Sequence, residues 1–304
     1  MAVEWVRNNI AKFGGDPKRI TIVGESAGGG SVDYYSYAWT EEPIVAGFIA
    51  QSGTIQLGPP RNASVSAALW ANATALLGCG NSTTGAERTL QCMRKKPVSE
   101  IMEAIGHVST LFTPFVDNKI VFPDYSARSR SGKFVKKPLL IGHNDYEAVL
   151  FDLIQRLKGI VLPQYVWDTM NTNGFFCPVA ARAAINTQHG VPTWRYRYFG
   201  DWPDMRLSST VYTGAYHGSE VNILFDTVPH GEGIPASMPE EVAFGKYMRG
   251  AWAAFARNPA RGLKEIGWPV YEEEGETLVR LAFRNSTGLN VGDPRTYDTI
   301  CKSQ

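Results

Sequence analysis

The sequence predicts an α/β fold, a doubly wound and mostly parallel sheet flanked by helices. Short β-branched or apolar runs alternate along the chain with longer segments whose apolar residues recur at helical spacing, and this alternation is typical of parallel sheets. With 304 residues, 44% of them hydrophobic, the chain is long enough to bury a sizeable core. No linker or internal repeat divides it, so we predict one domain spanning residues 1–304.

Each predicted strand is a short run rich in β-branched, aliphatic or aromatic residues. The run 194–199 also alternates with a period of two, as expected when successive side chains point to opposite faces. Helical or loop segments separate each run from the next, which favours parallel neighbours. The predicted strands cover residues 19–23, 45–50, 136–142, 194–199 and 278–283.

The predicted helices 1–13 and 239–257 have apolar residues three or four positions apart. In the first helix these are Val3, Val6, Ile10 and Phe13, and Gly14 ends it. The aromatic-rich region 150–190 is interpreted as a cap over the functional site, whereas the aromatic residues of the last helix are interpreted as core rather than cofactor contacts. The predicted helices are 1–13, 27–38 and 239–257, with mostly helical regions at 62–106 and 150–190.

A Gly-x-Ser-x-Gly pattern, Gly24-x-Ser26-x-Gly28, follows the first predicted strand. In a strand-to-helix elbow the central serine has strained backbone angles, and its neighbours two positions away must lack side chains or their Cβ atoms would collide. The hydroxyl then projects beside a helix N-terminus, whose free N–H groups favour developing negative charge. An ordinary corner is the alternative, but Asp16-Pro17 before the strand and the glycines after Ser26 favour a nucleophile.

The composition excludes several classes of partner. A net charge of +1 gives no reason to expect nucleic acid, an acidic ligand or an anionic membrane. No apolar run approaches the length of a membrane span, and no Cys/His cluster has zinc-ligand spacing. We therefore expect no nucleic-acid partner, no membrane span, no metal and no organic cofactor; the oligomeric state is left open.

Four Asn-x-Ser/Thr sequons and four cysteines point to a secreted glycoprotein, although sequons also arise by chance in polar loops. Cys79 and Cys92 bracket a floppy loop, and a bridge there would contribute about 3 kcal/mol; two buried thiols are the alternative. The segment Met1–Trp5 has no signal-peptide pattern, so we expect the front of the protein to be missing. The sequons are Asn62, Asn72, Asn81 and Asn285.

A nucleophilic serine needs a histidine base, which an acid must orient, and in this fold class the chain order is serine, acid, histidine. His217 lies in a loop after the fourth predicted strand, where such a base should emerge, but spacing alone does not choose among the five histidines. Asp145 and Glu147 both follow the third strand. Ser52 is an alternative nucleophile, better explained as the cap of a strand end. The histidines are His107, His143, His189, His217 and His230.

The segment Phe13–Pro17, followed by Gly24–Gly29, resembles the type-B carboxylesterase/cholinesterase family of α/β-hydrolases. The resemblance continues to the last residues but covers only the C-terminal part of such an enzyme. It implies Ser26 as nucleophile, His217 as base through its His-Gly-x-Glu motif, and Glu147 as acid, five positions after a strand-ending glycine. The family usually has glycine after the acid. This chain has Ala148 there, and we expect a slightly stiffer loop.

The same resemblance assigns further roles. It implies that Ala27 gives a backbone N–H to the oxyanion hole, that Glu25 lines the site, and that Glu220 is a buried carboxylate near the base. It also implies a disulfide between Cys79 and Cys92 and a second one between Cys177 and Cys301. The implied reaction is hydrolysis of a small-molecule ester through an acyl-enzyme by a secreted carboxylesterase or lipase-like enzyme.

One family feature is missing. The family's other oxyanion donors come from a His-Gly-Gly loop, which occurs nowhere in this sequence, and only about 25 residues precede Ser26. The loss of one such donor typically lowers the rate by about 10²–10³. We therefore expect an N-terminally truncated and inactive chain as written. An adhesion or binding module related to the family is a further alternative, disfavoured because all three triad positions are occupied.

Overall fold

The computed structural model describes residues 1–56, 61–107 and 112–301. By their internal contacts these residues form two compact units, one comprising Met1–Gly58 with Ser126–Gln304 and the other Pro59–Tyr125. The smaller unit is an insertion between the second and third strands of the larger one. The single domain over residues 1–304 stays a prediction.

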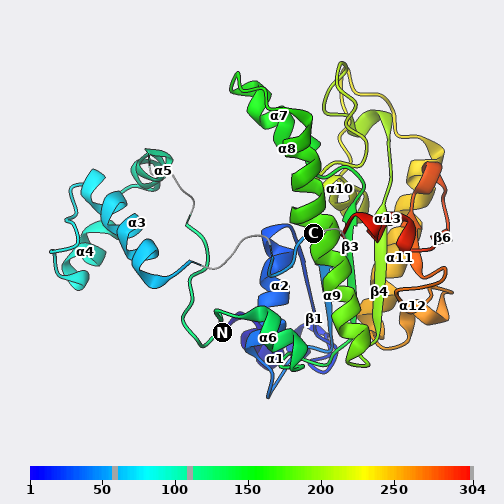
Figure 1. Cartoon of the computed structure of the whole chain (residues 1–304), viewed down its shortest axis with the longest axis horizontal. Helices are drawn as coiled ribbons and strands as arrows, with labels where there is room; N and C mark the ends of the chain where they lie inside the picture. Colours follow the sequence, from blue (N-terminus) through cyan, green and yellow to red (C-terminus); the bar gives the residue numbers. More distant parts are fainter. Residues whose placement is uncertain (57–60, 108–111, 302–304) are drawn as a thin grey trace. The chain divides into compact units, whose positions relative to one another are not determined.

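The larger unit is built on one six-stranded sheet whose strands lie in chain order (Figure 1). The first five strands are parallel and the sixth is antiparallel, which confirms the predicted mostly parallel sheet. The sixth strand was not predicted, because two residues carry no pattern. The strands are β1 (Thr21–Glu25), β2 (Gly47–Gln51), β3 (Leu139–Asn144), β4 (Thr193–Tyr198), β5 (Leu278–Leu281) and β6 (Val291–Gly292).

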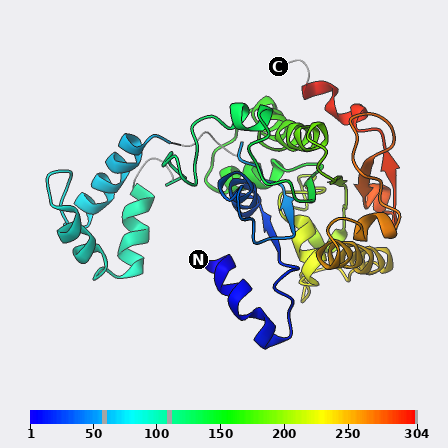
Figure 2. The same ribbon diagram turned by 90° about the horizontal axis from the view of Figure 1, so that it is seen from below.

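Helices cover both faces of this sheet (Figure 2). The helices α2 (Ala27–Ala38) and α9 (Cys177–Gln188) contribute to one apolar cluster, and α10 (Ser219–Phe225) and α11 (Pro239–Arg257) contribute to the other. The bounds of α2 and α11 agree with the predicted helices 27–38 and 239–257 residue for residue.

The alternation of side chains along β3 explains the two clusters. Leu139 and Ile141 pack with Val179 of α9, whereas Leu140, between them, packs with Phe255 of α11. Successive residues of a strand point to opposite faces, so a strand buried on both faces becomes apolar throughout. This arrangement holds the sheet rigid between two layers of helices.

The remaining α-helices are shorter or lie outside the sheet layers. They are α1 (Ala2–Asn9), α3 (Ala63–Leu76), α4 (Ala86–Met93), α5 (Val98–His107), α6 (Tyr125–Arg130), α7 (Val149–Leu157), α8 (Gln164–Thr169), α12 (Gly262–Glu265) and α13 (Arg295–Asp298). No helix within the described residues is both long and apolar enough to cross a membrane.

The region 150–190 is helical as predicted, but only part of it lies over the site. A π-helical turn, Met170–Phe176, joins α8 to α9. Phe151 of α7 and Phe175 of this turn contact the ring of His217. The expected cover is wrong for α9, because Val179 and Ala183 pack on the sheet.

Both disulfides implied by the resemblance are present. Cys79–Cys92 closes a short loop between α3 and α4 in the smaller unit. Cys177–Cys301 joins the start of α9 to the C-terminal segment, 124 residues away in sequence. Closing so long a loop removes much of the entropy of the unfolded chain.

The four sequons lie in different surroundings. Asn62, Asn72 and Asn81 are exposed in the smaller unit. Among the residues that the structure describes, Asn62 and Asn81 form hydrogen bonds through the side-chain oxygen and not through the nitrogen to which a glycan is attached. Asn285, in the larger unit, is half-buried, and its amide nitrogen donates to the carbonyl of Asp201 at 3.1 Å. Three of the four sequons are therefore open to modification.

Candidate active site

Ser26 lies at the turn between β1 and α2 with strained backbone angles, φ 56° and ψ −120°. Its N–H donates to the carbonyl of Gln51 at 2.9 Å, which fixes the turn against β2. A Cβ at Gly24 would lie 2.3 Å from the backbone of Gly28. Position 24 therefore excludes any side chain, as the Gly-x-Ser-x-Gly pattern predicted.

The same prediction is wrong for Gly28, where a Cβ would meet nothing within 4 Å. The other tight position is Gly53, whose Cβ would lie 2.0 Å from the carbonyl oxygen of Ser26. The loop after β2 thus presses directly on the elbow. This constraint lies 27 positions from Ser26 in the sequence, outside the Gly-x-Ser-x-Gly pattern.

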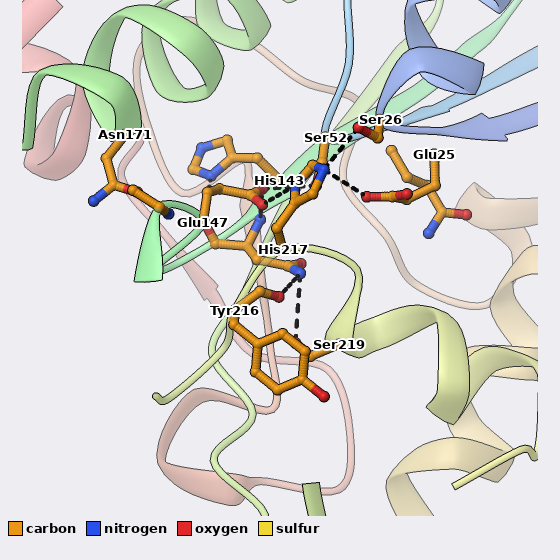
Figure 3. Close-up of polar contacts among 12 residues, drawn as sticks. Glu25, Ser26, Ser52, His143, Glu147, Asn171, Tyr216, His217 and Ser219 are labelled. Carbon is orange, nitrogen blue, oxygen red and sulfur yellow. Dashed lines mark hydrogen bonds and ion pairs between the residues drawn. The ribbon is translucent and has the colours of Figure 1, made fainter. Parts of the chain in front are cut away.

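The structure brings together the serine, histidine and glutamate that the sequence analysis singled out (Figure 3). The Oγ of Ser26 lies 2.7 Å from Nε2 of His217, although 191 residues separate them. The Nδ1 of His217 lies 2.6 Å from Oε2 of Glu147. The Glu147 side chain is fully buried and that of His217 is 8% exposed, so both contacts are largely shielded from water.

The topology explains this convergence. Ser26 and Glu147 follow β1 and β3, and parallel strands end at the same edge of a sheet. His217 comes from the long loop after β4, immediately before α10. The N–H of Tyr146 donates to the carbonyl of Ala215 at 3.0 Å, which attaches this loop to the one carrying Glu147.

The second carboxylate oxygen of Glu147, Oε1, is also held. It accepts the N–H of Asn144 at 2.6 Å and the hydroxyl of Ser52 at 2.7 Å. Ser52 therefore lies against the acid rather than against a substrate, and it does more than cap a strand. The only signal in the sequence was its place directly after a buried strand.

Ala148 causes no strain where the family usually has glycine. Its backbone is right-handed, with φ −70° and ψ −16°, so a Cβ is allowed. Its N–H donates to the side-chain oxygen of Asn171 at 2.8 Å. Asn171, in the π-helical turn, thus supports the loop of Glu147, and the sequence analysis did not identify it.

Three of the other candidate histidines pair with backbone carbonyls rather than with Ser26. His143 is fully buried, with Nδ1 2.9 Å from the carbonyl of Asn144. Burial, with the charges of the nearby Arg197 and Arg195, holds its pKa well below the usual range. His189 and His230 contact the carbonyls of Ser129 and Val228, and His107 ends α5 in the smaller unit.

Asp145, the alternative acid, pairs with Nε of Arg197 at 2.7 Å. Its carboxylate is thus engaged in an ion pair, whereas the carboxylate of Glu147 faces His217. Burial and side-chain direction separate two acids that lie only two positions apart in the sequence.

Two more carboxylates surround the histidine. Oε1 of Glu25 lies 3.3 Å from Nε2 of His217. Burial, reinforced by the charge of Glu147 and opposed by that of His217, raises the pKa of Glu25. Glu220 is fully buried, and burial together with the charge of Glu147 raises its pKa to about 7, against the opposing hydrogen bonds of Asn144 and Gln51.

These acids determine the basicity of His217. Burial disfavours its charged form, but the hydrogen bond and charge of Glu147, with the charges of Glu25 and Glu220, outweigh burial. The pKa of His217 is therefore raised above its ordinary value of 6.5. The imidazole is well suited to accept a proton from Ser26.

Ala27 is the first residue of α2, so its N–H lies at the end of the helix that attracts negative charge. No group of three or more His, Cys, Asp or Glu residues is arranged to hold a metal ion in the described parts of the chain. The arrangement places a serine hydroxyl, an imidazole and a carboxylate in one hydrogen-bonded line beside a helix N-terminus.

Comparison with known proteins agrees with this geometry. A profile of the carboxylesterase family matches residues 1–158. The chain is 33% identical to a chlorogenic acid esterase of Aspergillus niger, over 98% of this chain and 60% of that protein. It is 33% identical to secreted lipase 5 of Gibberella zeae, over 94% and 56%, and 28% identical to a para-nitrobenzyl esterase of Bacillus subtilis, over 91% and 61%.

The chain thus spans about three fifths of the length of these relatives. Its sheet, parallel except for one edge strand and flanked by helices, is that of an α/β-hydrolase. The extent of the family match and the identity over nearly the whole chain show that this protein belongs to the carboxylesterase family.

Proposed function

We propose that this protein hydrolyses carboxylic esters of small molecules through an acyl-enzyme formed on Ser26. The carrying observation is the continuous hydrogen-bonded path from Ser26 through His217 to Glu147. A serine hydroxyl becomes a useful nucleophile only when such a base takes its proton as it attacks. The strained turn at Ser26, beside the N-terminus of α2, supports the same assignment.

In the first half-reaction, Oγ of Ser26 attacks the ester carbonyl carbon while Nε2 of His217 takes the hydroxyl proton. Glu147 accepts the N–H at Nδ1 and stabilises the imidazolium that forms. Negative charge develops on the carbonyl oxygen, which accepts the N–H of Ala27 at the start of α2 in this proposal. His217 then protonates the departing alkoxide, and an alcohol leaves.

The second half-reaction repeats this chemistry with water as the nucleophile. His217 removes a proton from the water, which attacks the acyl carbonyl, and the imidazolium then returns the proton to Oγ of Ser26. A carboxylic acid leaves and the free serine is restored. The residues of this chain supply every proton transfer.

The reaction should depend on pH through His217, which must be neutral to act as a base. Because its pKa is raised above 6.5, the half-maximal rate is expected above pH 6.5. The rate should fall as the pH drops below that pKa and level off above it. The rate of Ser26 modification by a fluorophosphonate, followed from about pH 5 to about pH 9, measures this limb. A midpoint clearly below 6.5 would contradict the charge balance at His217.

The relatives favour an esterase or lipase-like enzyme, since those compared are an esterase that is named for chlorogenic acid, a secreted lipase and a para-nitrobenzyl esterase. The sequons and disulfides, with the relative named as a secreted lipase, support an extracellular location. The second candidate is a family member that binds or folds but does not turn over esters.

The deciding experiment is covalent labelling of the 304-residue chain with a fluorophosphonate and mapping of the adduct by mass spectrometry. We expect one adduct, on Ser26, and none after Ser26→Ala. A chain with native-like circular dichroism that remains unlabelled would favour the non-catalytic alternative. If the chain labels at Ser26, turnover of a short chromogenic ester by the unlabelled chain would then test the complete cycle, including deacylation.

A further inference from the structure

We propose that Gln51 is a positioning residue of this site. Its side-chain amide orients the Glu220 carboxylate and, through Glu220 and Asn144, the Glu147 carboxylate. The inference rests on the proposed function for the roles of Ser26, His217 and Glu147. The geometry of Gln51 itself is independent of that function. It follows from a buried hydrogen-bond network beneath the elbow.

The orientation of the Gln51 amide is determined by its neighbour. The indole Nε1 of Trp252, which can only donate, lies 3.0 Å from Oε1 of Gln51. The amide nitrogen, Nε2, therefore points the other way and donates to Oε1 of Glu220 at 2.9 Å. A flipped amide would place N–H against N–H at Trp252 and oxygen against oxygen at Glu220, so only one orientation is stable.

Glu220 transmits this orientation to the acid. Its second oxygen, Oε2, accepts Nδ2 of Asn144 at 2.6 Å, and Nδ2 also donates to the carbonyl of Tyr216 at 2.7 Å, next to His217. The backbone N–H of the same asparagine donates to Oε1 of Glu147. Two hydrogen-bonded steps thus connect Gln51 with the residue that holds Glu147.

Gln51 also contacts the nucleophile turn, because its backbone carbonyl accepts the N–H of Ser26 at 2.9 Å. Glu25 and Gln51 lie directly opposite each other in the pairing of β1 with β2. The backbone of Gln51 therefore holds the turn at Ser26, while its side chain holds the carboxylate of Glu220. Gln51 is 2% exposed, so water does not replace either contact.

The charge of Glu220 depends on these donors. Each of its oxygens accepts an N–H, and such bonds favour the ionised carboxylate. Burial and the charge of Glu147 favour the protonated form, and together these effects raise the pKa of Glu220 to about 7. The titratable groups that interact with Glu220 are Glu25, Glu147, Tyr196, Tyr198, Tyr216 and His217.

The loss of the Gln51 donor should therefore lower the pKa of His217. Without it, burial dominates and Glu220 takes up a proton at neutral pH. His217 then loses one of the negative charges that raise its pKa. A residue that merely filled space would leave the titration of the imidazole unchanged.

The test is the substitution Gln51→Met, which keeps the length of the side chain but removes both polar ends. We expect the pKa of His217 to fall by about 0.5 to 1, measured from the pH dependence of its imidazole NMR signals in the full chain. The acid limb of Ser26 phosphonylation should move in the same direction. An unchanged imidazole pKa in a folded variant would overturn the proposal.

The matched control uses the background Glu220→Gln, in which position 220 carries no charge. There, adding Gln51→Met should leave the pKa of His217 where Glu220→Gln alone put it, and a further fall would contradict action through Glu220. If Gln51→Met does not fold, Trp252→Phe removes only the donor that fixes the amide and should cause a smaller fall in the same direction. If the wild-type chain fails to label at Ser26 while Gln51→Met still lowers the pKa of His217, the proposed function is refuted and the positioning role remains.

Discussion

Replacing Glu147 with glutamine is expected to slow the phosphonylation of Ser26 by about 10⁴-fold, with little change in fold. The carboxylate accepts three donors, the N–H of Asn144, the hydroxyl of Ser52 and Nδ1 of His217. A glutamine that keeps its oxygen towards the first two must present its NH₂ group to Nδ1. The histidine then holds its proton on Nε2, which is the wrong tautomer for taking a proton from Ser26.

The measurement is the second-order rate of fluorophosphonate labelling for both proteins at a pH above the pKa of His217, with thermal unfolding as a check on the fold. Ser52→Ala is the matched control, because it removes one donor to Glu147 without changing the tautomer of His217. Its loss should be much smaller. A Glu147→Gln protein that labels within about tenfold of the wild-type rate would refute the assigned role of Glu147.

The second large effect concerns stability. Arg182→Met is expected to lower the free energy of unfolding by about 3–5 kcal/mol. Nε of Arg182, on α9, donates to Oδ1 of Asp33, on α2, at 2.7 Å, and both side chains are about 95% buried. The guanidinium also lies over the rings of Tyr37 and Phe134. Removal of the cation leaves a buried carboxylate without its counter-charge, and this is the costly state.

Urea denaturation of the wild-type and variant chains measures this loss. The matched control is the double variant Arg182→Met, Asp33→Asn, which removes the stranded charge and should recover part of the stability. If the single variant were as stable as the wild type, the ion pair would contribute nothing net. Because α2 begins directly after Ser26, a looser α2 should also slow labelling.

Local patterns in the sequence predicted the parts of the fold that local physics determines. The apolar periodicity of α11 and the small-residue run after Ser26 predicted the helices α11 and α2, and the Gly-x-Ser-x-Gly pattern predicted the elbow. The choice of His217 and Glu147 came from the family resemblance, because spacing alone left five histidines and two acids open. Chain order restricts such a site but does not select its members.

The supporting residues could not be predicted, because their roles depend on partners far away in the sequence. Ser52 reaches Glu147 across 95 positions, and Gln51 reaches Glu220 across 169. As isolated residues at a strand end, a serine and a glutamine have many ordinary explanations. The pairing of β2 with β3 and the loop that follows β4 bring both residues to the carboxylates around His217.

The row that Glu25, Gln51, Gly142 and Tyr196 form across four adjoining strands has a consequence for folding. The segment carrying Ser26 is local and is able to form early, whereas the base reaches it only after strands far apart in the sequence have paired. Loop closure over such separations is slow. We therefore expect a nascent or half-folded chain to carry a serine that no imidazole activates, so that reactivity towards acyl groups arises only when folding is complete.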